Sequence, residues 1–122
     1  MLSLLNMLPF HDREIQSANK TFDSILSFVN RNYMNNITLS EIASACSCSE
    51  STVSHLFKLH TGISAQKYII NLRLKQAEKL LSTSSLPITE IAFLCGFNNS
   101  NYFSTVFKKA KGISPSDYSK SQ

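Results

Sequence analysis

The sequence predicts an all-α protein in which two helix-turn-helix subdomains are joined by a long central linker helix. Apolar residues recur at helical spacing along most of the chain, and short polar or glycine-containing turns separate the helical segments. A second observation is an internal repeat with an offset of 49 or 50 residues. The repeated segments are Glu41-Ile42-Ala43 with Glu90-Ile91-Ala92, Phe57-Lys58 with Phe107-Lys108, and Gly62-Ile63-Ser64 with Gly112-Ile113-Ser114.

The first copy follows a predicted helix of about three turns. Its apolar positions run from Phe22 to Tyr33, with Asn19 or Thr21 as the expected N-cap. A capping box then begins at Thr38 and starts a short helix, and Ser49 can cap the next helix, which ends at Gly62. In this last helix we expect Val53, Leu56 and Phe57 to face inward, and Ser51, Ser54, His55 and Lys58 to face outward.

The linker helix is predicted from Ala65 to about Leu81, because it carries apolar residues on two sides. Pro87 opens the second copy, and Gly96-Phe97-Asn98 forms its turn. The helix after the turn places Tyr102, Phe103, Val106 and Phe107 inward. Its outward residues are Ser100, Asn101, Ser104, Thr105 and Lys108, and a short last helix carries Tyr118. The predicted division is a segment at 1–20, a first subdomain at 21–64, a linker helix at 65–82 and a second subdomain at 83–122.

A pair of helix-turn-helix units points to DNA, and the charge and composition of the chain are compatible with this interpretation. The net charge is +4, and residues 37–122 hold nine Lys or Arg against five Asp or Glu. No apolar run approaches the roughly 20 residues that span a bilayer, so we expect a cytoplasmic protein. The three histidines and three cysteines lack metal-ligand spacing, and no phosphate-binding glycine loop or carboxylate pair is evident, so no metal, cofactor or catalytic site is predicted. The cysteines are interpreted as small apolar residues in a reducing compartment.

Residues 21–119 resemble the DNA-binding domain of the AraC/XylS transcription regulators. The motifs that carry the resemblance are Leu39-x-x-Ile42-Ala43, Leu56-Phe57-Lys58, Gly62-x-Ser64, Tyr68-Ile69, Arg73-Leu74-x-x-Ala77-x-x-Leu80-Leu81, Ile88-x-x-Ile91-Ala92, Gly96-Phe97, Tyr102-Phe103, Phe107-Lys108 and Gly112-Ile113-Ser114-Pro115-x-x-Tyr118. The resemblance implies about seven helices, with two recognition helices that enter successive major-groove segments of double-stranded DNA. It also implies regulation of transcription, as an activator that recruits RNA polymerase, with repression by occlusion as the other option.

Carried over by position, the base-contacting residues are Ser51, Ser54 and His55 in the first copy, and Ser100, Asn101, Ser104 and Thr105 in the second. The expected phosphate contacts are Lys58, Arg73, Lys75, Lys108 and Lys109. The chain departs from the family pattern at Ser47, Cys48, His55 and Thr105, and the outward faces of both recognition helices lack arginine. Because strong bidentate reading of guanine is absent, an A/T-rich site is predicted.

The sequence leaves two alternatives open. The repeats could form a helical protein-interaction module with degenerate helix-turn-helix units instead of a DNA reader. The apolar start, Met1 to Pro9, is interpreted as part of a linker or preceding domain, through which the protein could dimerise, and a short stand-alone regulator is the other reading. The sequence does not identify the effector, the target genes or the sign of regulation.

Overall fold

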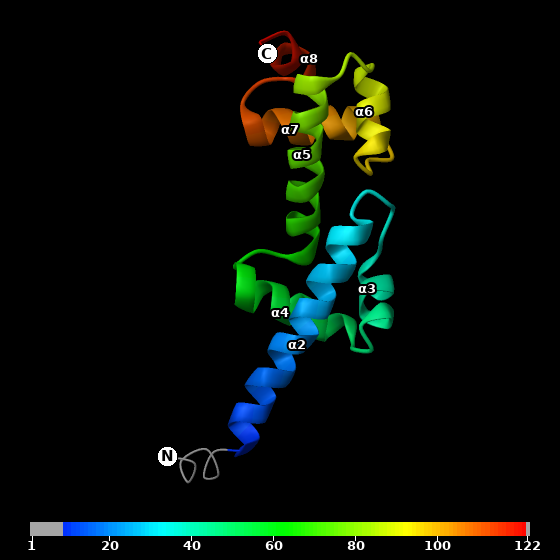
Figure 1. Ribbon diagram of the computed structural model, residues 1–122. Coiled ribbons are helices and arrows are strands. Elements are labelled where there is room, and N and C mark those ends of the chain that lie inside the picture. Colours follow the sequence, from blue (N-terminus) through cyan, green and yellow to red (C-terminus); the bar gives the residue numbers. More distant parts are fainter. Residues whose placement is uncertain (1–8, 122) are drawn as a thin grey trace. The chain divides into compact units, whose positions relative to one another are not determined.

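The computed structural model describes residues 9–121, with side chains from residue 16 onward, and this part of the chain is all α-helical. Its helices are α2 (Pro9–Asn32), α3 (Leu39–Ala45), α4 (Glu50–Thr61), α5 (Ala65–Thr83), α6 (Ile88–Leu94), α7 (Ser100–Lys111) and α8 (Pro115–Ser121) (Figure 1). The predicted fold class is therefore confirmed. The chain forms two compact units: the first holds the residues up to Asn30 and Thr38–Ala65, and the second holds Arg31–Ile37 and the chain from Gln66 onward.

Helix α2 begins earlier than the sequence predicted. It starts at Pro9, and Thr21, an expected N-cap, lies inside it and donates its hydroxyl to the carbonyl of Ser17 over 2.9 Å. The prediction of a helix start at Asn19 or Thr21 was wrong because proline suits the first turn of a helix and no glycine or further proline interrupts the chain before Thr21. The apolar residues 1–8, interpreted above as a linker or domain remnant, lie outside the described residues.

The two copies use equivalent residues to begin and end α4 and α7. The Ser49 side chain accepts a hydrogen bond from the Thr52 backbone N–H at the start of α4, and the Asn99 side chain accepts one from that of Tyr102 at the start of α7. Both helices end at a glycine in the left-handed conformation, Gly62 and Gly112. The repeat in the sequence is thus a repeat of local structure, including its caps.

The core of the first unit is built from one side each of α2, α3 and α4. Phe22, Ile25 and Val29 of α2 are buried, and the ring of Phe22 meets that of Phe57 edge-on at a centroid distance of 5.4 Å. The imidazole of His60 stacks on Phe22 at 4.4 Å. The other buried apolar residues are Ile42, Ala43, Val53, Leu56 and Ala65. This packing fixes which side of α4 faces outward.

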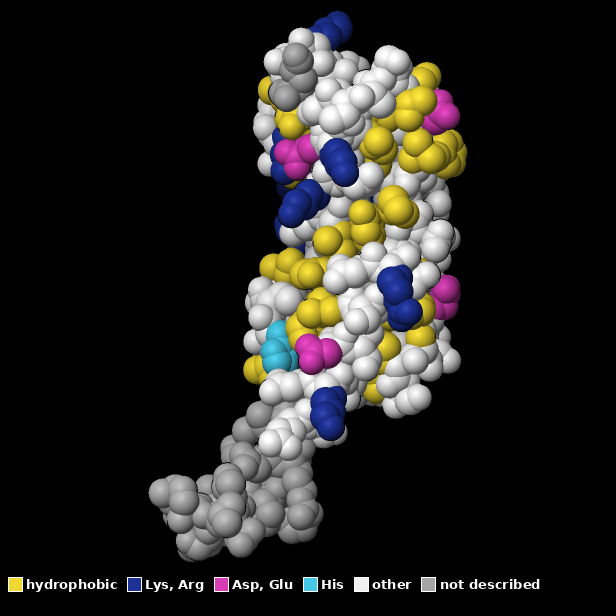
Figure 2. Space-filling view, in the orientation of Figure 1, with side chains coloured by type: hydrophobic (Ala, Val, Ile, Leu, Met, Phe, Trp, Pro, Cys, Tyr) yellow, Lys and Arg dark blue, Asp and Glu magenta, His cyan; other side chains and the backbone are white. Residues whose placement is uncertain are grey.

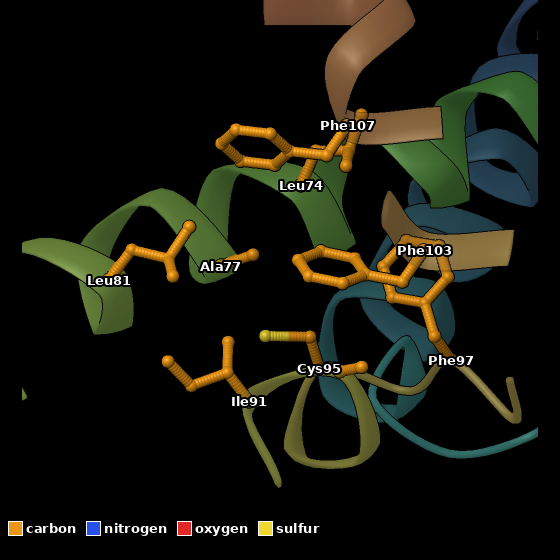
Figure 3. Close-up of a cluster of buried hydrophobic side chains, with 9 residues drawn as sticks. Leu74, Ala77, Leu81, Ile91, Cys95, Phe97, Phe103 and Phe107 are labelled. Carbon is orange, nitrogen blue, oxygen red and sulfur yellow. The ribbon is translucent and has the colours of Figure 1, made fainter. Parts of the chain in front are cut away.

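The core of the second unit gathers around α5. Leu74, Ala77 and Leu81 of α5 pack with residues of α6, of the turn after it and of α7, as Figure 3 shows. The rings of Phe97 and Phe103 are 5.0 Å apart, and those of Phe103 and Phe107 are 5.7 Å apart. The other members are Ile91, Ala92 and Cys95. The buried aromatic residues Phe103 and Phe107 thereby hold α7 by its inner side.

Residues 31–37 belong with the second unit, although the sequence placed them in the first subdomain, 21–64. The physical reason is Arg73 of α5, whose guanidinium donates to the backbone carbonyls of Tyr33 over 2.7 Å and Asn35 over 2.8 Å. Both acceptors lie just beyond the end of α2, where carbonyls lack helical partners. A long-range hydrogen bond of this kind leaves no mark in the local sequence pattern.

Candidate nucleic-acid interface

Helix α4 presents a continuous polar surface opposite its buried side. Ser51, Ser54, His55 and Lys58 are all exposed, at positions i, i+3, i+4 and i+7 of one helix face. Val53, Leu56 and Phe57 are buried at 0 to 3% exposure, so the helix cannot rotate without exposing its core. Acceptor and donor groups of these four residues are therefore held toward solvent by the packing behind them.

Helix α7 repeats this arrangement in its own unit. Asn101, Thr105, Lys108 and Lys109 are exposed, and Ser100 and Ser104 are half-buried. The hydroxyl of Thr105 donates to the carbonyl of Asn101 over 3.0 Å. Because that bond uses the hydroxyl hydrogen, Thr105 offers only acceptor lone pairs and its methyl group to a ligand. The carboxamide of Asn101 carries both donors and an acceptor, as reading of an adenine edge requires.

Tyr102 is more exposed than the sequence predicted. It was expected to pack inward, but 48% of it is accessible, and its ring lies 6.2 Å from that of Phe97. Tyr102, Thr105 and Lys109 follow a spacing of three and four residues, so the phenol borders the polar face of α7. The helical spacing could have revealed this, but the aromatic side chain favoured the interpretation as core.

The five predicted phosphate contacts fall into two groups. The four lysines, Lys58, Lys75, Lys108 and Lys109, are exposed. Arg73 is half-buried and donates to the two carbonyls described above, with its Cζ 5.9 Å from the centroid of the Phe97 ring. Burial lowers the pKa of Arg73, and the nearby Tyr102 hydroxyl offsets part of this shift. The structure favours a structural role for Arg73, and the lysines remain predicted phosphate contacts.

A second kind of exposed surface lies on α6. Phe93 is 64% exposed and Leu94 is 47% exposed, whereas the equivalent residues of the first copy are Ser44 and Ala45. Figure 2 shows hydrophobic side chains over the part of the surface where α6 lies. Exposed aromatic and aliphatic residues side by side are typical of a protein contact. The helical spacing of the sequence alone did not reveal this exposed pair.

Other types of site find no support in the described part of the chain. Among residues 16–121 there is no group of three or more His, Cys, Asp or Glu that could hold a metal ion. Within the described helices, none combines the length and apolar character needed to cross a membrane. Cys95 is fully buried, and burial raises the pKa of its thiol to about 11, so this sulfur stays protonated and unreactive near neutral pH.

Known proteins resemble this chain in sequence and in structure. A family model described as a helix-turn-helix domain matches residues 42–121, about two thirds of the chain. The activator RhaS of Salmonella schwarzengrund is 35% identical over 95 residues, which are 78% of this chain and 34% of RhaS. A solved regulator of Chromobacterium violaceum, described as having an AraC-type DNA-binding domain, is 26% identical with a TM-score of 0.77, over 86% of this chain and 94% of that one.

The chain belongs to the AraC/XylS family. Its helices are those of the AraC-type DNA-binding domain, and members of the family are DNA-binding transcription regulators. The DNA-binding domain of AdpA, solved in complex with a target DNA, is 25% identical with a TM-score of 0.76, over 80% of this chain and 87% of that one. This chain spans 34 to 62% of the length of curated AraC-type relatives that it matches.

Proposed function

We propose that this AraC-type domain binds double-stranded DNA sequence-specifically, by inserting α4 and α7 into successive major-groove segments. One observation carries the proposal: both helices turn a polar, exposed side outward from a buried aromatic side, and both begin and end with equivalent caps. The AdpA domain, which shares this fold, was solved with its target DNA. A protein that reads DNA in this way works in the bacterial cytoplasm, where the chromosome lies.

Base reading is assigned to the outward side chains of the two helices. Asn101 is the main base contact, because its exposed carboxamide can pair with both groups of an adenine edge. Thr105 offers a methyl group that suits thymine, while its hydroxyl is bonded to the Asn101 carbonyl. Since none of the remaining contacts is an arginine, the preferred site is A/T-rich. These remaining contacts are Ser51, Ser54, His55, Ser100 and Ser104.

Phosphate contacts are assigned to the exposed lysines Lys58, Lys75, Lys108 and Lys109. Lys58 and Lys108 occupy equivalent positions, each four residues before the glycine that ends its helix. A flexible cation at the edge of a recognition helix can reach the backbone of DNA and release a counterion. Such contacts set affinity and register, whereas the choice of sequence rests on the outward side chains.

We further propose activation of transcription through a contact with RNA polymerase. The relative RhaS is named an activator, and the exposed pair Phe93 and Leu94 lies on α6, not on a recognition helix. An apolar surface beside the exposed carboxylate of Glu90 fits a protein partner better than a phosphate backbone. The pair is also the observation that favours the second candidate function, a helical protein-interaction module.

Selection of bound duplexes from a random library, followed by gel shifts, tests DNA binding. The wild-type domain should retard the selected A/T-rich duplex, and a triple variant with Ser54, His55 and Asn101 changed to alanine should lose most of this specific binding. A pure protein-interaction module would retard no duplex. A preferred site with a G/C-rich core would contradict the assigned base contacts.

The first copy of the repeat supplies the substitutions that test the activation proposal. Phe93→Ser and Leu94→Ala together give α6 the residues that stand at the equivalent positions of α3. In an assay of transcription with purified polymerase, the protein with these changes should bind its site normally but lose activation. Undiminished activation would remove α6 as the polymerase contact.

A further inference from the structure

The guanidinium of Arg73 connects three parts of the second unit. Its Nε donates to the Tyr33 carbonyl over 2.7 Å, and its Nη2 donates to the Asn35 carbonyl over 2.8 Å. Its Cζ also lies 5.9 Å from the centroid of the Phe97 ring. One side chain of α5 is thus in contact with the segment after α2 and with the turn before α7.

The turn before α7 is packed closely against the same place. A Cβ built on Gly96 would lie 2.9 Å from Nε of Arg73 and 3.0 Å from the carbonyl oxygen of Met34. Phe97, the next residue, is 2% exposed, and its ring is in contact with those of Phe103 and Tyr102 in α7. A displacement of the Arg73 guanidinium would therefore shift Phe97. Because the Phe97 ring packs against α7, the position of α7 would change as well.

The contacts of Arg73 need the shape of a guanidinium. Two carbonyl acceptors are reached at once by N–H groups held in a rigid planar fork, while the plane of the fork lies near an aromatic ring. A lysine ammonium keeps the charge but is a single point on a flexible stem. A DNA phosphate, by contrast, is also bound by lysine, which acts there as a point charge.

We propose that Arg73 is a positioning residue that fixes the orientation of α7 for reading DNA, and that it is not a phosphate contact. The inference rests on the proposed function of α7 as a recognition helix. It deepens that function by making base reading in the second segment depend on a side chain that touches no base. Arg73 acts on α7 through its contact with the Phe97 ring. Its guanidinium is held in place by the hydrogen bonds to the carbonyls of Tyr33 and Asn35.

The test compares Arg73→Lys and Arg73→Ala with Lys75→Ala, a change at an exposed cation on the same helix. Binding is measured to the selected site and to two versions in which only the segment read by α4 or only that read by α7 is scrambled. Both Arg73 variants should lose about tenfold or more of the discrimination at the α7 segment and keep that at the α4 segment. Lys75→Ala should weaken binding to all three duplexes alike.

Salt dependence separates positioning from phosphate contact. In the Arg73 variants the slope of log K against log salt should equal that of the wild type, whereas in Lys75→Ala it should be shallower by about 0.9. The proposal is overturned if Arg73→Ala also flattens the slope and Arg73→Lys restores it. It is equally overturned if both variants melt at a lower temperature but discriminate at both segments like the wild type.

A measurement without DNA keeps the two proposals distinguishable. Hydrogen exchange of backbone amides should be faster in α7 of Arg73→Lys than in the wild type, with α4 unchanged. If the wild type binds no duplex, the DNA-reading proposal fails, while faster exchange confined to the second unit still supports Arg73 as the residue that holds α7. Equal exchange in the two proteins would remove Arg73 from that role.

Discussion

A Cβ atom on Gly96 would lie 2.8 Å from the backbone carbonyl oxygen of Tyr33. Gly96 also has a φ of 99°, in a region that side chains rarely adopt. The two residues are 63 positions apart, yet the turn of the second helix-turn-helix lies directly on the segment that follows α2. The glycines Gly62 and Gly112 also have positive φ but meet no atom within 4 Å of such a Cβ, so their requirement is conformational only.

Gly96→Ala should therefore destabilise the domain more than Gly62→Ala. The left-handed conformation costs a side chain about 1 kcal/mol at either position. At Gly96 the methyl group also meets backbone atoms that cannot move aside cheaply, so we expect a loss of about 3 kcal/mol or more. Urea unfolding of the two variants measures the difference, and equal losses would contradict the close packing at Gly96.

Ser47→Gly should stabilise the first unit slightly. Ser47 occupies the equivalent turn position and is the one non-glycine residue with a positive φ, 55°, in the described part of the chain. Removing its side chain relieves strain of about 1 kcal/mol in the folded state. Glycine also raises the conformational entropy of the unfolded chain, which offsets part of this, so the net gain in stability is up to about 0.5 kcal/mol. Ser44→Gly is the control: Ser44 is exposed inside α3, where glycine should cost about 0.5 kcal/mol. If both variants were less stable than the wild type, the side chain of Ser47 would not be a source of strain.

Asn101→Ala should weaken binding and relax specificity at one A·T pair. Loss of a bidentate contact with adenine is worth about 1 to 3 kcal/mol of discrimination. Binding titrations against the selected site and its single substitutions at that pair measure the change. Asn71→Ala removes an exposed carboxamide from α5 and should leave the profile unchanged. A uniform loss of affinity over all sequences would reassign Asn101 to the phosphate backbone.

Salt should weaken DNA binding by an amount that the lysines determine. Four phosphate contacts predict a slope of log K against log salt of about −3.6, and each of Lys58→Ala and Lys108→Ala should make it shallower by about 0.9. Lys120 of α8 is exposed and is not an assigned contact, so Lys120→Ala serves as the matched control. A slope that does not change with Lys58 or Lys108 would exclude that lysine from the interface.

Cys95 should resist alkylation in the folded domain, because it is fully buried and its thiol has a pKa raised to about 11. Mass spectrometry after iodoacetamide treatment at pH 8 should find Cys46 and Cys48, which are both half-buried, modified before Cys95. Stability should also fall as pH rises from 9 toward 11, because the unfolded thiol ionises there while the folded thiol does not. Cys95→Ala should remove this part of the decline, and an equally steep decline in that variant would contradict the assignment.

Much of the domain could be read from local patterns. The caps at Thr38 and Ser49, the glycine ends at Gly62 and Gly112, and the buried and outward sides of α4 are signals carried by residues within one or two turns of each other. Local patterns failed where two signals competed. The start of α2 was misplaced because Thr21 is a good cap in sequence but a helix interior in structure, and Tyr102 was taken as core because it is aromatic.

The sequence by itself determined the all-α class and the outward polar residues of α4 and α7, because helical periodicity and caps are short-range properties. It also determined the two equivalent helix-turn-helix copies and the resemblance to the family, because repeats and motifs are found by comparing stretches of sequence. Only the tertiary structure decided that residues 31–37 pack with the second unit, that Arg73 is bonded to Tyr33 and Asn35, and that Phe93 and Leu94 are left exposed. These facts depend on contacts between residues far apart in the chain, or on the absence of such contacts, and spacing along a sequence does not encode them.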